Sequence, residues 1–177
     1  GSVGEGDVFY WDDIEFVGGG SSSTQIDLPV TFESATIDYT LTDFGGNSSA
    51  LGTDPVSSSN TVAISTKNTG AEVWAGTTIG TPDGFLSAIP FTSTDTKISV
   101  NIYSPAAGIP ILLKVEDSSN SAISCETQMT TTVANSWETI VFDFTNEAAG
   151  TPALDFSMTY NKASIFFDFG NSGTGSI

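Results

Sequence analysis

The chain contains no histidine and no arginine, and its 177 residues include only four lysines and one cysteine. Without histidine, a Ser-His-Asp triad, a Cys-His pair and any metal centre built on imidazole are excluded. A single cysteine, Cys125, allows neither an internal disulfide nor a cysteine-rich zinc cluster. Because Cys125 falls at an apolar position of an alternating segment, we expect a buried thiol.

Positive charge is scarce, since 21 acidic residues against four lysines give a formal net charge of −17. Such a chain repels phosphate backbones, and we expect no nucleic-acid partner. No run approaches the roughly 20 apolar residues that span a bilayer, so we expect no membrane insertion. The acids favour cations, above all Ca²⁺, which takes oxygen ligands only. They can equally serve to keep an extracellular protein soluble.

What is present is alternation with a period of two, punctuated by Gly, Asn, Ser and Pro. No long segment has the spacing of an amphipathic helix. The expected strands place on shared faces Tyr10, Ile14 and Phe16; Val30 and Phe32; Ile37, Tyr39 and Leu41; Val62 and Ile64; residues 72–78 around Trp74; Ile98, Val100 and Ile102; Ile111, Leu113 and Val115; Ile123, Cys125, Thr127 and Met129; Ile140, Phe142 and Phe144; and Ile165, Phe167 and Phe169. This pattern predicts an all-β, antiparallel β-sandwich of the jelly-roll type.

One hairpin is well specified, because the turn cluster 117–121 lies between two alternating segments. If the apolar positions of both strands are buried, four polar side chains share the other face: Lys114, Glu116, Glu126 and Gln128. This patch is either an ordinary solvated sheet face or a hydrogen-bonding platform for a sugar.

Sugar binding also needs an aromatic surface, since an indole ring stacks on the C–H face of a pyranose. Small residues, Ala71, Ala75 and Gly76, flank Trp74 and leave its ring accessible. Trp74 is the best candidate because the strand next to it is polar. The alternative is that Trp74 serves in packing. Glu116 and Glu126 could in principle hydrolyse glycosides, but a flat sheet face supplies neither a deep cleft nor a raised pKa. No nucleotide-binding motif is present, and we expect a protein that is not an enzyme.

The two ends of the chain resemble each other, since residues 1–8 (GSVGEGDV) read like residues 170–177 (GNSGTGSI). We therefore expect three parts: residues 1–17 with a strand equivalent to the closing strand of a module, a flexible linker 18–25, and a sandwich module 26–177. The first strand would complete its own sheet or that of an identical subunit, which would produce filaments or tubes. The side chains that would fill the acceptor are Phe9, Trp11, Ile14 and Phe16.

Several segments carry a family resemblance: YWDDIEFV, LPVTFES, YTLTDFGG, AEVWAGT, YSPAAGIPILLKVED, WETIVFDFTNEAAGTPAL and YNKASIFFDFG. They resemble jelly-roll modules of secreted polysaccharide-degrading proteins of marine bacteria, similar to carbohydrate-binding modules of families 4 and 22. The resemblance implies a non-catalytic, extracellular or cell-surface module that binds a neutral polysaccharide such as a β-glucan.

The resemblance also implies a structural Ca²⁺. In similar modules the acidic pair of the closing strand and a glutamate of the first strand hold the ion, here Asp12, Asp13 and Glu33, with Asp143 as a weaker candidate. The alternative is that these acids only cap turns or face solvent. The YWDD segment normally closes the family's domain at its C-terminal end, whereas here it stands near the N-terminus. An ion at this place would make folding or assembly depend on calcium.

Overall fold

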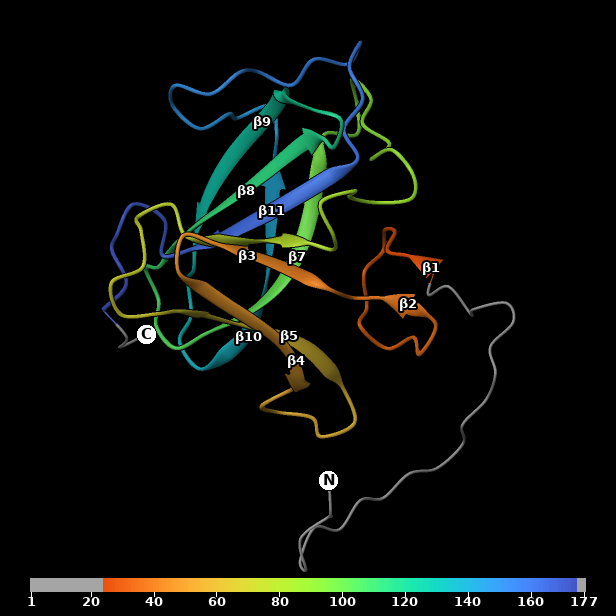
Figure 1. Ribbon diagram of the computed structural model, residues 1–177. Coiled ribbons are helices and arrows are strands. Elements are labelled where there is room, and N and C mark those ends of the chain that lie inside the picture. Colours follow the sequence, from red (N-terminus) through yellow and green to blue (C-terminus); the bar gives the residue numbers. More distant parts are fainter. Residues whose placement is uncertain (1–23, 175–177) are drawn as a thin grey trace, which may run out of the picture.

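The computed structural model describes residues 24–174, and this part of the chain is all-β and contains no helix. Figure 1 shows the arrangement of its strands. In chain order they are β1 (Thr24–Gln25), β2 (Ile37–Asp38), β3 (Leu41–Phe44), β4 (Asn47–Thr53), β5 (Thr61–Lys67), β6 (Gly76–Ile79), β7 (Lys97–Ser104), β8 (Pro110–Asp117), β9 (Asn120–Thr130), β10 (Ser136–Asp143) and β11 (Lys162–Phe167). Among these residues nothing forms a helix of the length and apolarity needed to cross a membrane.

The main element is a five-stranded antiparallel sheet with the order β3-β6-β11-β8-β9. Strands far apart in the sequence are therefore neighbours, and β11 lies between β6 and β8. In Figure 1 this sheet lies in front of a second antiparallel pair, β7 and β10. Two smaller pairs are the antiparallel hairpin of β4 and β5 and the short parallel pair of β1 and β2.

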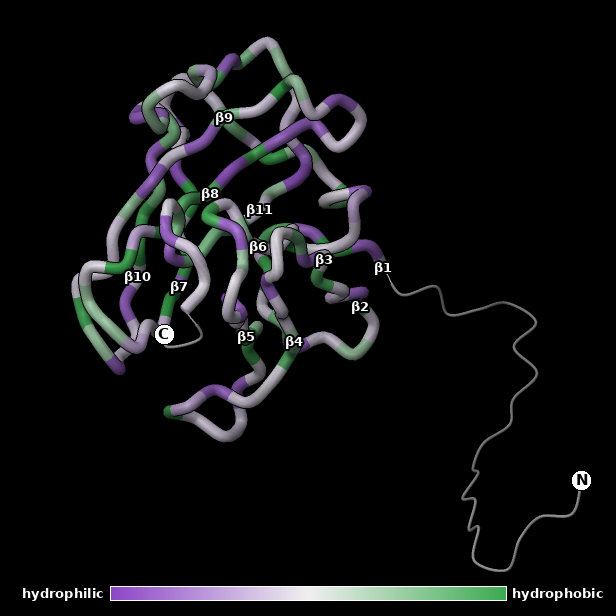
Figure 2. The backbone as a smooth tube through the Cα atoms, turned by 60° about the vertical axis from the view of Figure 1, so that its left-hand side comes forward, coloured by the Kyte–Doolittle hydropathy of each residue, from purple (hydrophilic) through white to green (hydrophobic). Residues whose placement is uncertain are grey.

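The hydrophobic core lies between the five-stranded sheet and the pair β7–β10, which makes the architecture sandwich-like. The sheet contributes the inward positions of β8, β9 and β11, and β10 with the residue after it contributes large rings from the other side. Fully buried members are Ile111, Leu113, Val115, Cys125, Phe142 and Phe144. Figure 2 shows hydrophobic residues gathered along these central strands. The predicted inward faces of β8 and β10 and the buried thiol of Cys125 are confirmed.

The hairpin of β4 and β5 contacts the five-stranded sheet through hydrogen bonds between polar side chains and backbone groups. Asp43 of β3 accepts hydrogen bonds from the Asn47 side chain (2.8 Å) and the Ser49 backbone amide (2.6 Å). Asn47 also donates to the Ser65 hydroxyl at 2.9 Å. Partial burial is the largest single influence and raises the pKa of Asp43, but the hydrogen bonds from Ser49, Asn47 and Thr77 together hold this pKa below its usual value. A charged carboxylate therefore anchors this hairpin.

Four local expectations differ from the structure. Val30 and Phe32 lie in no strand, and Phe32 has a positive φ of 62°. Residues 72–75 form turns and coil, and β6 begins only at Gly76, so Trp74 is not in a strand. Thr24 and Gln25, the last two residues of the expected linker, form β1. Strand β4 was not expected, because its sequence NSSALGT is small and polar and lacks clear alternation.

Candidate functional site

The outer face of the five-stranded sheet, which points away from the core, gathers three rows of side chains. Residues paired across a ladder project to the same face, so the register defines the rows. The charged row combines Lys162, Glu116 and Ser124; the middle row Thr42, Thr78, Ser164, Lys114 and Glu126; and the aromatic row Phe44, Gly76, Phe166, Leu112 and Gln128. Five strands from distant parts of the chain thus build one surface.

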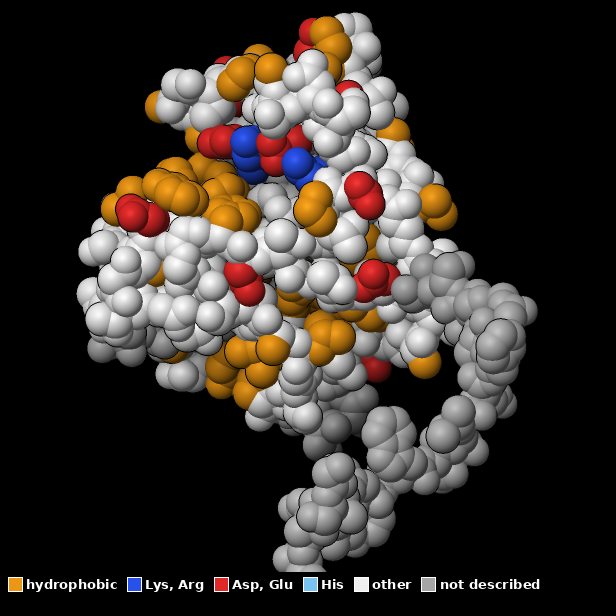
Figure 3. All heavy atoms as spheres, viewed as in Figure 1, with side chains coloured by type: hydrophobic (Ala, Val, Ile, Leu, Met, Phe, Trp, Pro, Cys, Tyr) orange, Lys and Arg blue, Asp and Glu red, His pale blue; other side chains and the backbone are white. Residues whose placement is uncertain are grey.

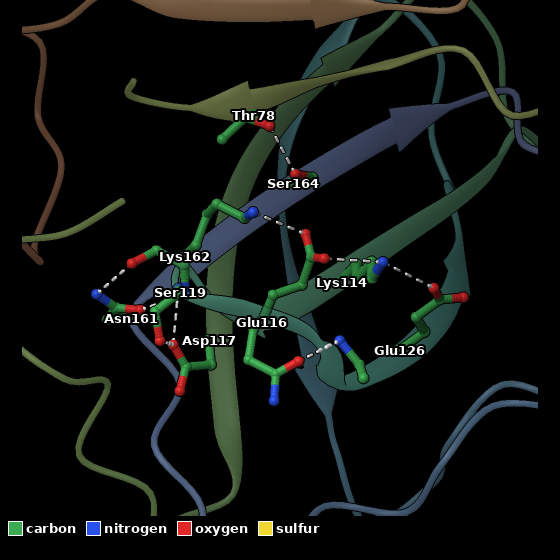
Figure 4. A network of polar contacts seen from close by, with 12 residues as sticks. Thr78, Lys114, Glu116, Asp117, Ser119, Glu126, Asn161, Lys162 and Ser164 are labelled. Carbon is green, nitrogen blue, oxygen red and sulfur yellow. Dashed lines mark hydrogen bonds and ion pairs between the residues drawn. The ribbon is translucent and has the colours of Figure 1, made fainter. Parts of the chain in front are cut away.

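Four charges alternate across β11, β8 and β9 on this face (Figure 4). Glu116 contacts the ammonium groups of Lys114 at 3.0 Å and Lys162 at 3.5 Å, and Lys114 also lies 3.9 Å from Glu126. Glu116 is only 7% exposed, so its charge depends on these two partners. Two of the four lysines of a strongly acidic chain are therefore committed to this cluster.

The turn next to the charged cluster is held by Asn161, which precedes β11. Its side-chain oxygen accepts the Ser118 backbone amide at 2.8 Å, and its side-chain amide donates to the Ser118 hydroxyl at 3.0 Å. The Asn161 backbone amide donates to the Glu116 carbonyl at 2.9 Å. These bonds fix the start of β11, and with it Lys162, against the end of β8 (Figure 4).

Beside the charges, the Thr78 and Ser164 hydroxyls form a hydrogen bond of 2.9 Å between β6 and β11. Both residues are buried although they lie on the outer face. Leu112, in the same face of β8, is 1% exposed. The centre of the outer face is therefore shielded by the side chains around it.

The aromatic row forms a connected group of rings at the other end of the face. The Phe44 ring stacks on the Trp74 ring, with centroids 6.3 Å apart and planes 15° apart. Phe44 meets Phe166 edge-on at 5.2 Å, and Phe166 meets Phe169 at 5.8 Å. Trp74 is 49% exposed, so one large part of its ring surface remains open to solvent. Such an exposed, supported ring is a suitable stacking surface.

Two glycines make room for these rings. A Cβ atom on Gly45 would lie 3.0 and 3.1 Å from atoms of the Trp74 ring, and Gly45 also has a positive φ of 66°. A Cβ atom on Gly76 would lie 2.6 Å from the Ile165 carbonyl oxygen and 3.0 Å from the Phe166 ring. The absence of a side chain at both positions therefore lets the rings lie close against the strands.

A buried lysine ties the Trp74 loop to the end of β11. The Lys67 ammonium donates to the Asp168 carbonyl at 2.8 Å and, more weakly, to the carbonyls of Val73 and Phe167, each at 3.4 Å. Burial lowers the pKa of Lys67, while the negative charge of Asp168 opposes that shift. Lys67 is thus positioned to hold the residues on both sides of the aromatic row together.

The space-filling view shows the two halves of the site next to each other on the face seen in Figure 1. In Figure 3 blue lysine and red acidic side chains lie in a line, and a patch of hydrophobic side chains lies beside them. The structure therefore combines an exposed aromatic surface with charged hydrogen-bonding groups on one side of one sheet.

The structure brings together most of the expected glycan-binding residues. Lys114, Glu116 and Glu126 share one ion-pair cluster, and Gln128 is exposed on the same face, paired with Leu112. Trp74 reaches that face from the turn before β6 rather than from a strand. Other members were not expected from the sequence: Lys162, Ser164, Thr78, Phe44, Phe166 and Phe169. The one local signal was Phe166, which alternates with the apolar positions assigned to the core.

The expected calcium ligands are less well placed. Glu33 is exposed, and one of its carboxylate oxygens accepts the Thr61 backbone amide at 2.6 Å. No group of three or more Asp, Glu or Cys side chains able to hold a metal occurs within residues 24–174. Asp12 and Asp13 lie outside the described residues, as do the expected strand-donation residues Phe9, Trp11, Ile14 and Phe16.

Asp143, the weaker calcium candidate, already has partners for both oxygens. Its Oδ1 accepts from the Thr96 hydroxyl at 3.0 Å and from the Thr145 amide and hydroxyl at 3.1 and 2.8 Å, and its Oδ2 lies 3.4 Å from the Lys97 ammonium. The hydrogen bonds from Thr145 are the main reason why the pKa of Asp143 falls to about 2. Asp143 therefore fits a turn cap better than a metal ligand, and Glu33 remains the only expected ligand in the described part with an oxygen to spare.

No protein-family model, no curated protein and no solved structure matches this chain.

Proposed function

We propose that the outer face of the five-stranded sheet binds a neutral polysaccharide and that the protein is a non-catalytic carbohydrate-binding module. The observation that carries the proposal is the combination of a half-exposed, ring-supported tryptophan with a row of charged and amide side chains on one sheet face. An extended sugar chain lying across β6, β11, β8 and β9 would meet both.

Trp74 would supply the stacking contact. Its ring lies parallel to Phe44, which fixes its orientation, and about half of its surface is free. Stacking of a rigid, pre-oriented aromatic ring loses little conformational entropy on binding, and this favours recognition of a flat, apolar sugar face.

The polar row would recognise hydroxyl groups. Among the described residues, the Glu126 carboxylate has only a long contact of 3.9 Å to Lys114, and Gln128 is exposed, so these two groups retain donors and acceptors for a ligand. The two lysines and two glutamates of the cluster balance each other in charge, whereas the whole chain carries −17. A neutral glycan is therefore favoured over an anionic one, which the overall field would repel.

Binding without cleavage is favoured by the contacts of the two carboxylates. A glycosidase needs one carboxyl group that keeps its proton near neutral pH. Glu116 and Glu126 both lie near the Lys114 ammonium, and Glu116 also contacts Lys162. Both carboxylates are thus already engaged by lysine ammonium groups on the sheet face, which fits a role in holding the polar row better than a role in proton transfer.

The proposal includes a jelly-roll sandwich, a structural Ca²⁺ held by Glu33 with Asp12 and Asp13, and action outside the cell. The support for the jelly roll is the order of the five-stranded sheet, in which the late strand β11 returns between early strands. Extracellular action follows from the proposed ligand, because structural polysaccharides lie outside cells.

Affinity electrophoresis in gels that contain soluble β-glucans tests the proposal. We expect retardation of the wild type, and Trp74→Ala should bind at least about tenfold more weakly, which corresponds to about 1.4 kcal/mol. Gln128→Ala and Glu126→Gln should weaken binding to a smaller extent. The matched control is Val141→Ala, since Val141 is an exposed apolar residue on β10, in the other layer. Equal affinity of the wild type and Trp74→Ala for every glycan that is bound would refute the assigned site.

A further inference from the structure

Strand β7 has one long edge without a partner in residues 24–174. Its eight residues, Lys97–Ser104, pair with β10 along their whole length and without a register shift. Beyond that ladder, the backbone hydrogen bonds of the described residues reach only its two ends, where the Phe144 amide donates to the Thr96 carbonyl and the Asn135 amide donates to the Ser104 carbonyl. Half of the peptide groups between these ends therefore point away from β10 toward an open edge.

At two other edges of the sandwich, neighbouring chain makes hydrogen bonds to the edge strand. At β9 the Ala148 amide donates to the Glu126 carbonyl at 2.7 Å. At β10 the Glu138 carboxylate accepts the amide of Thr132 at 2.9 Å, which holds the preceding loop beside that strand. Proteins usually protect long regular edges in such ways, or with proline, bulges or charge. Strand β7 has no proline, and its one charged residue, Lys97, lies at its first position and pairs with Asp143.

The apolar core is also incomplete beside the first half of β7. Ile98 and Val100 occupy the inward face of β7 but are only partly buried. On the neighbouring strand β10, Ile140 and Phe142 are 5% and 0% exposed. Ile102, further along β7, is 4% exposed, so burial decreases from β10 to β7 only over the first half of β7.

We propose that residues 9–17 of the same chain pair antiparallel with β7 and complete this sheet. The segment FYWDDIEFV is long enough for the eight residues of β7, and Tyr10, Ile14 and Phe16 fall on one face by alternation. Turned inward, Ile14 and Phe16 would cover Ile98 and Val100. By alternation the other face, with Phe9, Trp11 and Glu15, would point to solvent, so of the four expected strand-donation residues only Ile14 and Phe16 would enter the core.

The position of β1 favours the chain's own segment over that of a second copy. The Leu86 amide donates to the Ile26 carbonyl just after β1, and Phe91 packs on Phe144, whose amide binds the Thr96 carbonyl. The loop between β6 and β7 thus contacts both the chain just after β1 and the residue just after β10. An antiparallel partner of β7 would end beside the start of β7, and residues 18–23 form a linker that can extend roughly 20 Å toward Thr24.

The short linker and the net charge of the chain also favour pairing of residues 9–17 with β7 of the same chain. A short flexible linker gives the tethered segment an effective concentration of about millimolar. A second copy would have to approach a molecule of net charge −17 with its own charge of −17. Completion within one chain therefore competes well against exchange between chains.

Disulfide trapping in the full chain tests the proposal. Asn101, exposed on the outward face of β7, is changed to Cys and combined in turn with Trp11→Cys and Glu15→Cys. Cys125 is buried and does not interfere. We expect one combination to form a disulfide within a single chain, at monomer mass. The control combines Gln128→Cys, on the outer face of the five-stranded sheet, with Glu15→Cys and should not cross-link. Disulfide-linked dimers or ladders would overturn the assignment to the same chain and favour strand donation between subunits.

Hydrogen exchange supplies an independent readout. In the full chain, Ile14→Pro should raise the exchange rate of β7 amides by about tenfold or more, because it removes part of the new ladder. Ser21→Pro, a proline in the linker, should leave β7 protected. If neither cysteine combination cross-links and Ile14→Pro leaves β7 exchange unchanged, residues 9–17 do not occupy this edge. Neither measurement uses a glycan, so the result does not depend on the proposed function.

Discussion

The close packing of Phe166 on β6 leads to a sharp prediction about Gly76. A Cβ atom at this position would lie 2.6 Å from the Ile165 carbonyl oxygen, whereas an ordinary contact begins at 3.4 Å. The obstacle is backbone of the neighbouring strand, so no side-chain rotation can remove it. Gly76 has no positive φ, and the effect of Gly76→Ala would therefore come from crowding alone.

We expect Gly76→Ala to lower the free energy of unfolding by about 1–3 kcal/mol, the usual cost of overpacking in a well-packed site. For a chain of this size that corresponds to a fall of roughly 3–10 °C in Tm. Because β6 and β11 share only two registered pairs, Ser164 with Thr78 and Ile165 with Thr77, the ladder has little length over which to distribute the strain. Displacement of the Phe166 ring should also weaken glycan binding.

Urea unfolding followed by tryptophan fluorescence measures the effect, with Gly52→Ala as the matched control. Gly52 also lies in a strand without a positive φ, and its added Cβ would meet the Ile64 Cδ1 atom at 2.5 Å. Ile64 is 48% exposed, so this side-chain end can move away, and we expect a change within about 0.5 kcal/mol. Equal stability of the wild type and Gly76→Ala, or equal loss in both variants, would refute this reasoning.

Three further predictions concern single side chains. Lys67→Met, which removes the 2.8 Å bond to the Asp168 carbonyl, should destabilise the protein by about 1–3 kcal/mol in urea unfolding and weaken glycan binding; unchanged values would show that the lysine does not hold the aromatic row. Because the pKa of Asp143 is about 2 in the folded protein and ordinarily 3.8, its stabilising effect is present above pH 4 and lost as the pH falls toward 2. The stability difference between the wild type and Asp143→Asn should therefore disappear over that interval in acid titrations, and a difference that persists at pH 2 would contradict this account. Since burial raises the pKa of Cys125 to about 11, Ellman's reagent at pH 8 should label the thiol only in urea, and rapid labelling of the native protein would contradict its buried position.

Local alternation predicted the strands of the core well. The inward side chains of β8 and β10 and the buried Cys125 follow directly from a period of two. The shared polar face of Lys114, Glu116 and Glu126 could also be predicted from the sequence, because one hairpin sets the register of its own two strands. Where the sequence pattern was weak, as in the small, polar strand β4, the prediction missed the element.

The position of Trp74 in a turn was harder to predict from the sequence. Trp74 was expected inside a strand over residues 72–78, but Lys67 and the last residues of β11 hold its loop in place through contacts from distant parts of the chain. Val30 and Phe32 alternate as a strand would, yet a strand forms only when a neighbour offers hydrogen bonds, and no described segment pairs with theirs.

By itself, the sequence determined the all-β class, the inward faces of the central strands and the polar hairpin, because these depend on neighbours a few residues apart. Only the tertiary structure decided the site. The order β3-β6-β11-β8-β9 places Lys162 beside Glu116 and brings Phe44, Trp74 and Phe166 into contact, although long stretches of chain separate them. Strand order depends on how whole layers bury their apolar faces together, and no local period in the sequence encodes it.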